Sequence, residues 1–184
     1  MMKIVPLEIP GLLRVEPDMF RDERGFFFEA YHRDKYKECG IREDFVQDSH
    51  SFSRFGTLRG LHAQAPHAQA KIIRVAEGEI FDVAVDARPR SPTFGKWISE
   101  IITGENGFQF YIPPGFLHGF LVLSERAQVV YKSSDFYFPG GELGVRWDDA
   151  DLSIRWPQRP LFLSEKDRKA PPFESLRERF NQFG

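Results

Sequence analysis

Short apolar runs separated by turn residues recur along the chain from about residue 45 to 156. The runs are rich in β-branched and aromatic residues, and Gly, Asn, Asp and Pro separate them at the spacing of an all-β sandwich or barrel. Helical patterns are confined to residues 33–39, which Gly40 follows as a C-cap, and to residues 174–180. The sequence therefore predicts an all-β fold with short helices at its periphery.

Two apolar runs, at residues 71–75 and 79–86, flank Glu77 and Gly78. Glycine supplies the positive φ that a tight turn needs, so this pattern predicts a β-hairpin. A second strand-turn-strand unit is expected at residues 97–112, and shorter strands at 128–131 and 143–147. The order of the strands in the sheet does not follow from these patterns.

Composition limits the partners and the compartment. With 184 residues the chain is expected to form one domain, residues 1–184. A net charge of -2 provides no basic field for nucleic acid or an anionic membrane. Asp82, Asp86 and His118 interrupt the apolar runs well before membrane-spanning length. The single cysteine, Cys39, excludes an internal disulfide and fits a reducing compartment, so we expect a soluble cytoplasmic protein.

The run of residues 57–64 places Arg59 and His62 three positions apart among apolar residues. An imidazole, with a pKa of about 6.5, can take up a proton near neutral pH, and a guanidinium can bind a phosphate through two hydrogen bonds. The pair therefore indicates proton transfer on an anionic substrate. The alternative, which is favoured for an isolated histidine, is a buried imidazole bonded to a carbonyl beside an arginine whose stem lies along the core.

Two strings resemble those of the cupin barrel: residues 60–64, Gly-Leu-His-Ala-Gln, and residues 113–118, Pro-Pro-Gly-Phe-Leu-His. Metal-binding cupins carry two histidines one residue apart in the first string. Gln64 breaks that pair, so no metal centre is expected. A ligand set rebuilt around His62, His67 and His118, as in a metal-dependent oxygenase, is kept as an alternative.

Longer strings resemble the dTDP-4-dehydrorhamnose 3,5-epimerases of deoxysugar biosynthesis, in the family's order and over nearly the whole chain. They are residues 20–29, 45–48, 58–62, 71–75, 78–86, 91–95, 112–120, 130–132 and 163–167. The resemblance implies a cupin-type double-stranded β-helix, or jelly roll, with short peripheral helices. It also implies an isomerase without a cofactor that inverts C3 and C5 of dTDP-4-dehydro-6-deoxy-D-glucose to give dTDP-4-dehydro-L-rhamnose.

The chemistry of this reaction explains the residue types. The protons on C3 and C5 both lie α to the C4 carbonyl, so a single enolate-stabilising site can serve both carbons. By resemblance, His62 is the base and Asp167 orients its ring. Lys71 would stabilise negative charge on the C4 oxygen, and Tyr131 would return a proton from the opposite face. Taken singly, Lys71, Tyr131 and Asp167 would be an ordinary strand lysine, a core or interface tyrosine and an exposed charged turn.

The resemblance also implies contacts to the nucleotide sugar and a homodimer, with Tyr137 stacking on thymine. The other contact residues are Arg24, Phe26, Glu29, Gln47, Asp48, Ser49, Arg59, His118, Glu142 and Lys166. N-terminal residues of one subunit complete the partner's site in this family, which would place Arg24, Phe26 and Glu29 in trans. Dimer packing is the alternative role for the phenylalanines at 26–28.

Two positions depart from the family. Ala63 stands where an aromatic residue is usual, and Ser49 where asparagine is usual. Strand alternation puts residue 63 on the face opposite His62, where packing behind the site would change. Ser49 is shorter and lacks the second hydrogen-bonding atom of an amide. These departures leave open an epimerase that acts at C3 only or C5 only, or on a related nucleotide sugar, and a binding module without catalysis also stays open.

Overall fold

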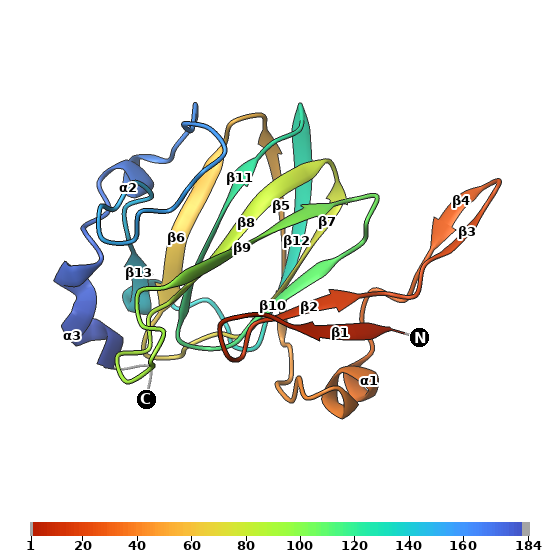
Figure 1. Ribbon diagram of the computed structural model, residues 1–184, viewed down its shortest axis with the longest axis horizontal. Helices are drawn as coiled ribbons and strands as arrows, with labels where there is room; N and C mark the ends of the chain where they lie inside the picture. Colours follow the sequence, from red (N-terminus) through yellow and green to blue (C-terminus); the bar gives the residue numbers. More distant parts are fainter. Residues whose placement is uncertain (1, 182–184) are drawn as a thin grey trace.

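The computed structural model describes residues 2–181, and most of its strands form two sheets that pack face to face (Figure 1). The first sheet has the order β1 (Lys3–Pro6), β2 (Leu13–Glu16), β10 (Gln109–Ile112), β7 (Lys71–Glu77), β12 (Arg126–Ser133) and β5 (Gln47–Arg54). The second has the order β13 (Glu142–Gly144), β6 (Leu58–Gln64), β11 (Phe116–Val122), β8 (Glu79–Asp86) and β9 (Trp97–Thr103). Neighbouring strands are antiparallel, as in the jelly roll that the sequence predicts.

The prediction of a β-hairpin at Gly78 was wrong. β7 pairs with β10 and β12 in one sheet, whereas β8 pairs with β11 and β9 in the other. Gly78 does have a positive φ, of 87°. Its turn is held by tertiary contacts, because the N–H of Glu79 donates to Oγ of Ser124 at 2.8 Å. The turn therefore carries the chain from one sheet to the other, and β9 and β10 are likewise in different sheets.

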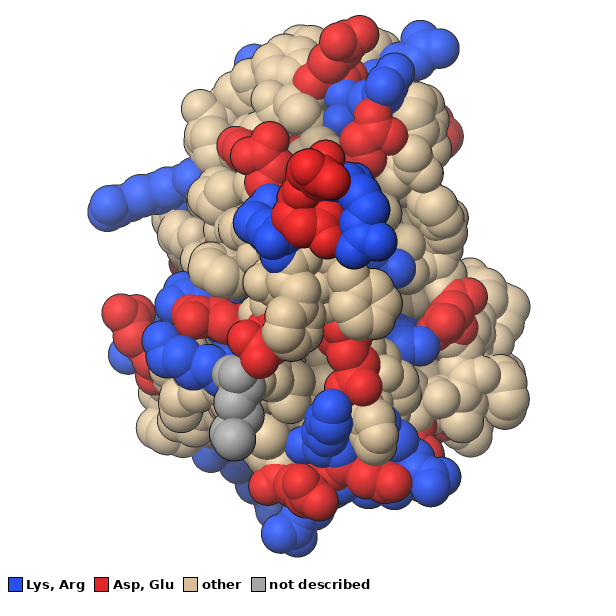
Figure 2. Space-filling model, turned by 90° about the vertical axis from the view of Figure 1, so that its right-hand side faces the viewer, with Lys and Arg blue, Asp and Glu red and all other residues tan. Residues whose placement is uncertain are grey.

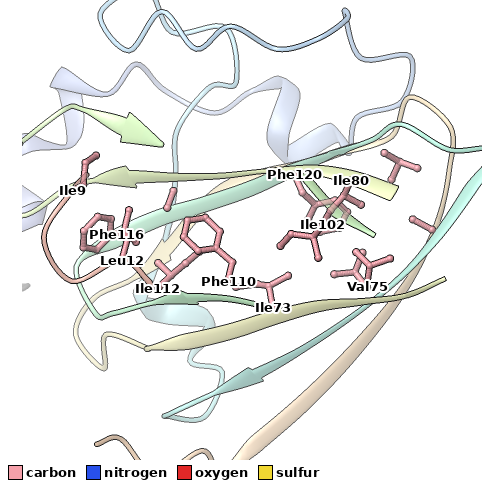
Figure 3. Close-up of a cluster of buried hydrophobic side chains, with 14 residues drawn as sticks. Ile9, Leu12, Ile73, Val75, Ile80, Ile102, Phe110, Ile112, Phe116 and Phe120 are labelled. Carbon is pink, nitrogen blue, oxygen red and sulfur yellow. The ribbon is translucent and has the colours of Figure 1, made fainter. Parts of the chain in front are cut away.

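Apolar side chains from both sheets fill the interior (Figure 3). Ile73 and Phe110 come from the first sheet, and Ile80 and Phe120 from the second. Successive residues of a strand point to opposite faces, so residues two apart share a face. This alternation puts the polar side chains of Lys71, Asp82, His118 and Tyr131 on the same inner faces as Ile73, Ile80, Phe120 and Val129.

Different segments cover the outer faces of the two sheets. The second sheet packs against the C-terminal segment, in a cluster that joins Leu61, Ala63 and Val83 to Phe173 and Phe180. Ala63 is thus buried behind the strand that carries His62, as strand alternation predicts. The first sheet is covered in part by the helix α1 (Arg33–Glu38), whose Tyr36 packs in a third cluster.

The predicted helices are present, with two additions. α1 ends where Gly40 adopts a φ of 94°. The C-terminal helix is a 3₁₀ turn, η2 (Glu174–Leu176), followed by α3 (Arg177–Phe180). A further helix, α2 (Glu165–Arg168), occupies a run that by itself reads as an exposed charged turn, and a short 3₁₀ turn, η1 (Pro139–Gly141), precedes β13. Within residues 2–181, no helix is long and apolar enough to span a membrane.

A small hairpin of β3 (Phe20–Asp22) and β4 (Gly25–Phe27) lies outside both sheets and extends away from the barrel (Figure 1). Phe20, Phe26 and Phe27 on this hairpin are exposed. Figure 2 looks onto the side from which the hairpin projects, and acidic and basic residues are interspersed there. The face shows no broad basic area of the kind that binds nucleic acid.

Candidate active site

His62 and Asp167 form a close pair. Nε2 of His62 lies 2.6 Å from Oδ1 of Asp167, which is almost fully buried. The helix α2 positions the carboxylate, because its N-cap residue Ser164 accepts a hydrogen bond from the N–H of Asp167 at 3.0 Å. Burial by itself would raise the pKa of Asp167, but hydrogen bonds from His62 and Ser164 hold that pKa below its usual value. An ionised carboxylate therefore fixes the orientation of the imidazole.

Lys71 is half-buried on the inner face of β7. Burial lowers the pKa of its amine to about 8, while the charges of Asp82 and Glu142 oppose the shift. His62, Lys71 and Tyr131 line both of two adjoining hollows, of about 310 and 370 Å³. A base, a cation and a phenol therefore border the same space. A cation in such a site can stabilise an oxyanion strongly, because few water molecules screen it.

His118 and Asp82 form a second pair. Nε2 of His118 lies 2.6 Å from Oδ1 of Asp82, and both side chains are buried. His118 is the register partner of His62 on the neighbouring strand, so the two imidazoles come from adjacent strands. The sequence interpretation included His118 and missed Asp82. The signal was an aspartate in the centre of the apolar run of residues 79–86, on the same strand face as Ile80 and Ala84.

Tyr137, Glu142 and Lys166 meet at the rim. The hydroxyl of Tyr137 donates to Oε2 of Glu142 at 3.1 Å, and Nζ of Lys166 donates to Oε1 at 2.5 Å. The negative charge of Glu142 raises the pKa of Tyr137. Burial would raise the pKa of Glu142, but Lys166 holds it below its usual value. An exposed ring and a cation thus stand together at the mouth of the cavity.

Alternate residues of the strand β5 face the cavity. Gln47 and Ser49 line the first hollow, and Nε2 of Gln47 donates to Oγ of Ser49 at 3.2 Å. Arg59 lines the second hollow and donates from Nε to Oγ of Ser53 at 3.0 Å. Asp48 lies between Gln47 and Ser49 and points outward, to a Lys132 amine at 2.8 Å. Its side chain therefore does not line the cavity of its own chain beside Gln47 and Ser49.

The three N-terminal residues assigned to the site lie elsewhere. Arg24 is paired with Asp22 at the tip of the hairpin, and Glu29 is paired with Lys35 at 2.8 Å. Phe26 stacks on Phe28, with ring centroids 6.0 Å apart. Neither hollow is lined by any of these residues. Within one subunit the structure does not bring them to His62.

The histidines of residues 2–181 do not form a metal centre. His62 and His118 each direct Nε2 at a carboxylate oxygen. His67 lies on the segment after β6, where its Nδ1 is 3.4 Å from Oδ2 of Asp135. Among the residues that the structure describes, no group of three or more His, Cys, Asp or Glu side chains could hold a metal ion. His62, His67 and His118, the ligands that the oxygenase alternative requires, therefore do not form a metal site.

Comparison with known proteins assigns the family. Residues 6–175 match the family model for dTDP-4-dehydrorhamnose 3,5-epimerase. The chain belongs to this family. It is 51% identical to the dTDP-4-dehydrorhamnose 3,5-epimerase of Pseudomonas aeruginosa over 174 residues, which are 94% of this chain and 96% of that protein. The resemblance seen in the sequence strings is thereby confirmed.

Two solved structures are also similar. The Legionella pneumophila epimerase RmlC, in complex with dTDP-4-keto-L-rhamnose, has a TM-score of 0.95 and 44% identity, covering 98% of this chain and 97% of that chain. ChmJ of Streptomyces bikiniensis, a 3'-monoepimerase in complex with dTDP-quinovose, has a TM-score of 0.89 and 32% identity, covering 96% and 91%. Since both kinds of epimerase share the fold, overall similarity alone does not set the number of carbons inverted.

Proposed function

We propose that the protein inverts C3 and C5 of dTDP-4-dehydro-6-deoxy-D-glucose, which gives dTDP-4-dehydro-L-rhamnose. One observation carries the proposal: His62, paired with Asp167, and Tyr131 border one cavity from opposite sheets, with Lys71 between the sheets. A sugar ring bound there would have a base on one face and an acid on the other. Inversion needs that arrangement, because the proton must leave from one face and return to the other.

The reaction proceeds in two parts at each carbon. His62 removes the proton on C3, the electron pair of the C–H bond moves into an enolate, and the Lys71 ammonium stabilises the charge on the C4 oxygen. Tyr131 then gives its phenolic proton to C3 from the opposite face. Exchange with water removes the proton from His62 and restores the one on Tyr131. The same cycle at C5 completes the conversion.

The nucleotide part occupies the rim. Tyr137 provides an exposed aromatic face for the base, and Arg59 and Lys166 provide cations for the two phosphates. His118, Gln47, Ser49 and Glu142 complete the polar lining of the cavity. Asp48 is left out because its side chain faces away. The substrate assignment is supported by the Legionella epimerase, whose structure is a complex with dTDP-4-keto-L-rhamnose.

We also propose that two subunits assemble, and that the β3–β4 hairpin of each delivers Arg24, Phe26 and Glu29 to the partner's cavity. The hairpin projects from the barrel with exposed phenylalanines, of which Phe27 is 71% exposed. Apolar rings on a projecting element favour a covered location. The free thiol of Cys39 is compatible with a cytoplasmic location.

Product analysis tests the proposed function. The purified protein is incubated with dTDP-4-dehydro-6-deoxy-D-glucose, and the configuration at C3 and C5 is read from proton couplings in NMR spectra. We expect inversion at both carbons, with no inversion for His62→Asn. Inversion at one carbon only would identify a monoepimerase, and binding without conversion by the unaltered protein would identify a binding module.

A further inference from the structure

Gln64 uses its side chain to hold the main chain around Tyr137. It is buried on β6, two residues after His62. Its Oε1 accepts the N–H of Phe138 at 2.7 Å, and its Nε2 donates to the carbonyl oxygens of Phe136 at 3.1 Å and His67 at 2.7 Å. Both ends of the amide are therefore committed to backbone groups, and two of those groups belong to the residues on either side of Tyr137.

A second glutamine holds the same loop from the opposite sheet. Oε1 of Gln47, on β5, accepts the N–H of Tyr137 at 2.9 Å. The segment of residues 134–138 is outside the strands and helices, so it lacks the hydrogen bonds that a sheet would supply. Gln64 and Gln47 instead supply hydrogen bonds to the main chain at Tyr137 and at the residues on either side of it. Further along, Gln69 donates to the carbonyl of Asp135 at 2.8 Å.

The ring of Tyr137 depends on this backbone for its place. It is 54% exposed, and its hydroxyl reaches Glu142 at 3.1 Å. An exposed side chain on an irregular loop would lose conformational freedom when a base stacks on it, and that loss weakens binding. Fixing the main chain before the ligand arrives removes part of this cost. Gln64 is placed to do so, because its hydrogen bonds bracket Tyr137.

We propose that Gln64 is a positioning residue for nucleotide recognition, which holds the Tyr137 ring ready to stack on the base of a pyrimidine nucleoside diphosphate. The inference rests on the proposed function, in which Tyr137 contacts that base. The residue at position 64 would then have a role of its own in nucleotide recognition. His62 and Gln64 share one face of β6, so a single strand sets both the base that takes the proton and the loop that recognises the nucleotide.

A double-mutant cycle with dTDP as the ligand tests this proposal. Gln64→Met keeps the approximate size of the side chain and removes its three hydrogen bonds. Calorimetry measures dTDP affinity for the unaltered protein, Gln64→Met, Tyr137→Ala and the double variant. We expect Gln64→Met to weaken binding by about tenfold, and by less than about twofold in the Tyr137→Ala background, because no ring is left to position.

Kinetics separate positioning from general support of the fold. In Gln64→Met we expect KM for the ketosugar to rise by about tenfold while kcat stays within about threefold, since the His62 pair is untouched. Gln128→Met is the matched control. Gln128 donates to Oε2 of Glu77 at 2.8 Å and does not line the cavity, so its replacement should change neither dTDP affinity nor KM.

The outcomes are distinct. An equal loss of dTDP affinity with and without Tyr137 would overturn the proposal, and so would an unchanged affinity in Gln64→Met. If Gln64→Met does not fold, Gln64→Glu, which keeps an acceptor for the Phe138 N–H and lacks a donor, goes through the same cycle with the same criteria. If the unaltered protein neither binds dTDP nor converts the ketosugar, the proposed function fails, whatever the variants of Gln64 do.

Discussion

Nε2 of His62 lies 2.6 Å from Oδ1 of Asp167, although 105 positions separate the two residues in the sequence. The carboxylate is buried, and the backbone N–H of Asp167 donates to Oγ of Ser164, so the residue has a fixed place in α2. The pair therefore joins the strand β6 to a helix of four residues. The orientation of the base depends on that short helix.

Replacing Asp167 by Asn should lower kcat by about 100-fold or more, because the imidazole loses the ionised partner that orients it and stabilises its protonated form. The affinity for dTDP should stay within about twofold. Steady-state kinetics and calorimetry measure the two effects. Glu165→Gln, on the exposed side of the same helix, is the control and should keep full activity. A kcat for Asp167→Asn within threefold of the unaltered value would contradict the role of the pair.

The pH dependence of kcat/KM should report Lys71. Burial lowers the pKa of its amine to about 8, so the cation is lost as the pH rises through that value. Since the cation stabilises the enolate in the proposed reaction, kcat/KM should fall above about pH 8. Lys71→Arg keeps a charge throughout this range, so its profile should lack that fall even if its rate is lower. An identical alkaline limb in both proteins would assign the titration to another group.

At Gly78 the chain turns from the first sheet to the second. A side chain at this position should lower the stability of the fold. A Cβ at this position would clash with the carbonyl oxygen of Arg126, so Gly78→Ala requires the main chain to move. Gly40 also has a positive φ but has no atom within 4 Å of the site of a Cβ. Gly40→Ala should cost about 1–2 kcal/mol of unfolding free energy, and Gly78→Ala at least about 1 kcal/mol more. Equal losses in urea denaturation would argue against this packing.

The strands and most of the site could be predicted from sequence. Apolar periodicity located β7, β8 and β12, and the family strings pointed to His62, Lys71 and Tyr131, which the structure brings to one cavity. The pairing of the strands was harder to predict from the sequence. A glycine turn has the same local pattern whether the next strand returns beside the first or crosses to the other sheet, and distant partners such as Ser124 decide between the two.

Side-chain direction and long-range pairs explain the remaining differences. Asp48 was grouped with Gln47 and Ser49, but adjacent residues of a strand face opposite ways. Asp82 pairs with His118 across 36 positions; its place in an apolar run signals a buried carboxylate but does not identify His118 as its partner. Gln64 appeared in the sequence only as a residue that breaks a metal-binding pattern. Its hydrogen bonds to residues 136 and 138 depend on how two loops meet in space.

The proposed exchange of hairpins can be tested by mixing subunits. Dimers of Arg24→Ala and dimers of His62→Asn should each be impaired. A mixed dimer should contain one intact site, formed by His62 of one subunit and Arg24 of the other. Co-expression of the two variants should therefore restore activity to about a quarter of the unaltered level. Activity no higher than that of the separate variants would contradict a contribution in trans.

Proton exchange with solvent tests directly whether His62 and Tyr131 transfer protons at opposite faces of the sugar. The ketosugar is converted in D2O, and NMR follows deuterium at C3 and C5. Transfer between His62 on one sheet and Tyr131 on the other predicts one deuterium at each of the two carbons of the inverted product, with C3 and C5 inversion impaired in Tyr131→Phe. A product that is inverted at both carbons without incorporated deuterium, or a ketosugar that stays unlabelled and unchanged, would contradict proton transfer by these two residues.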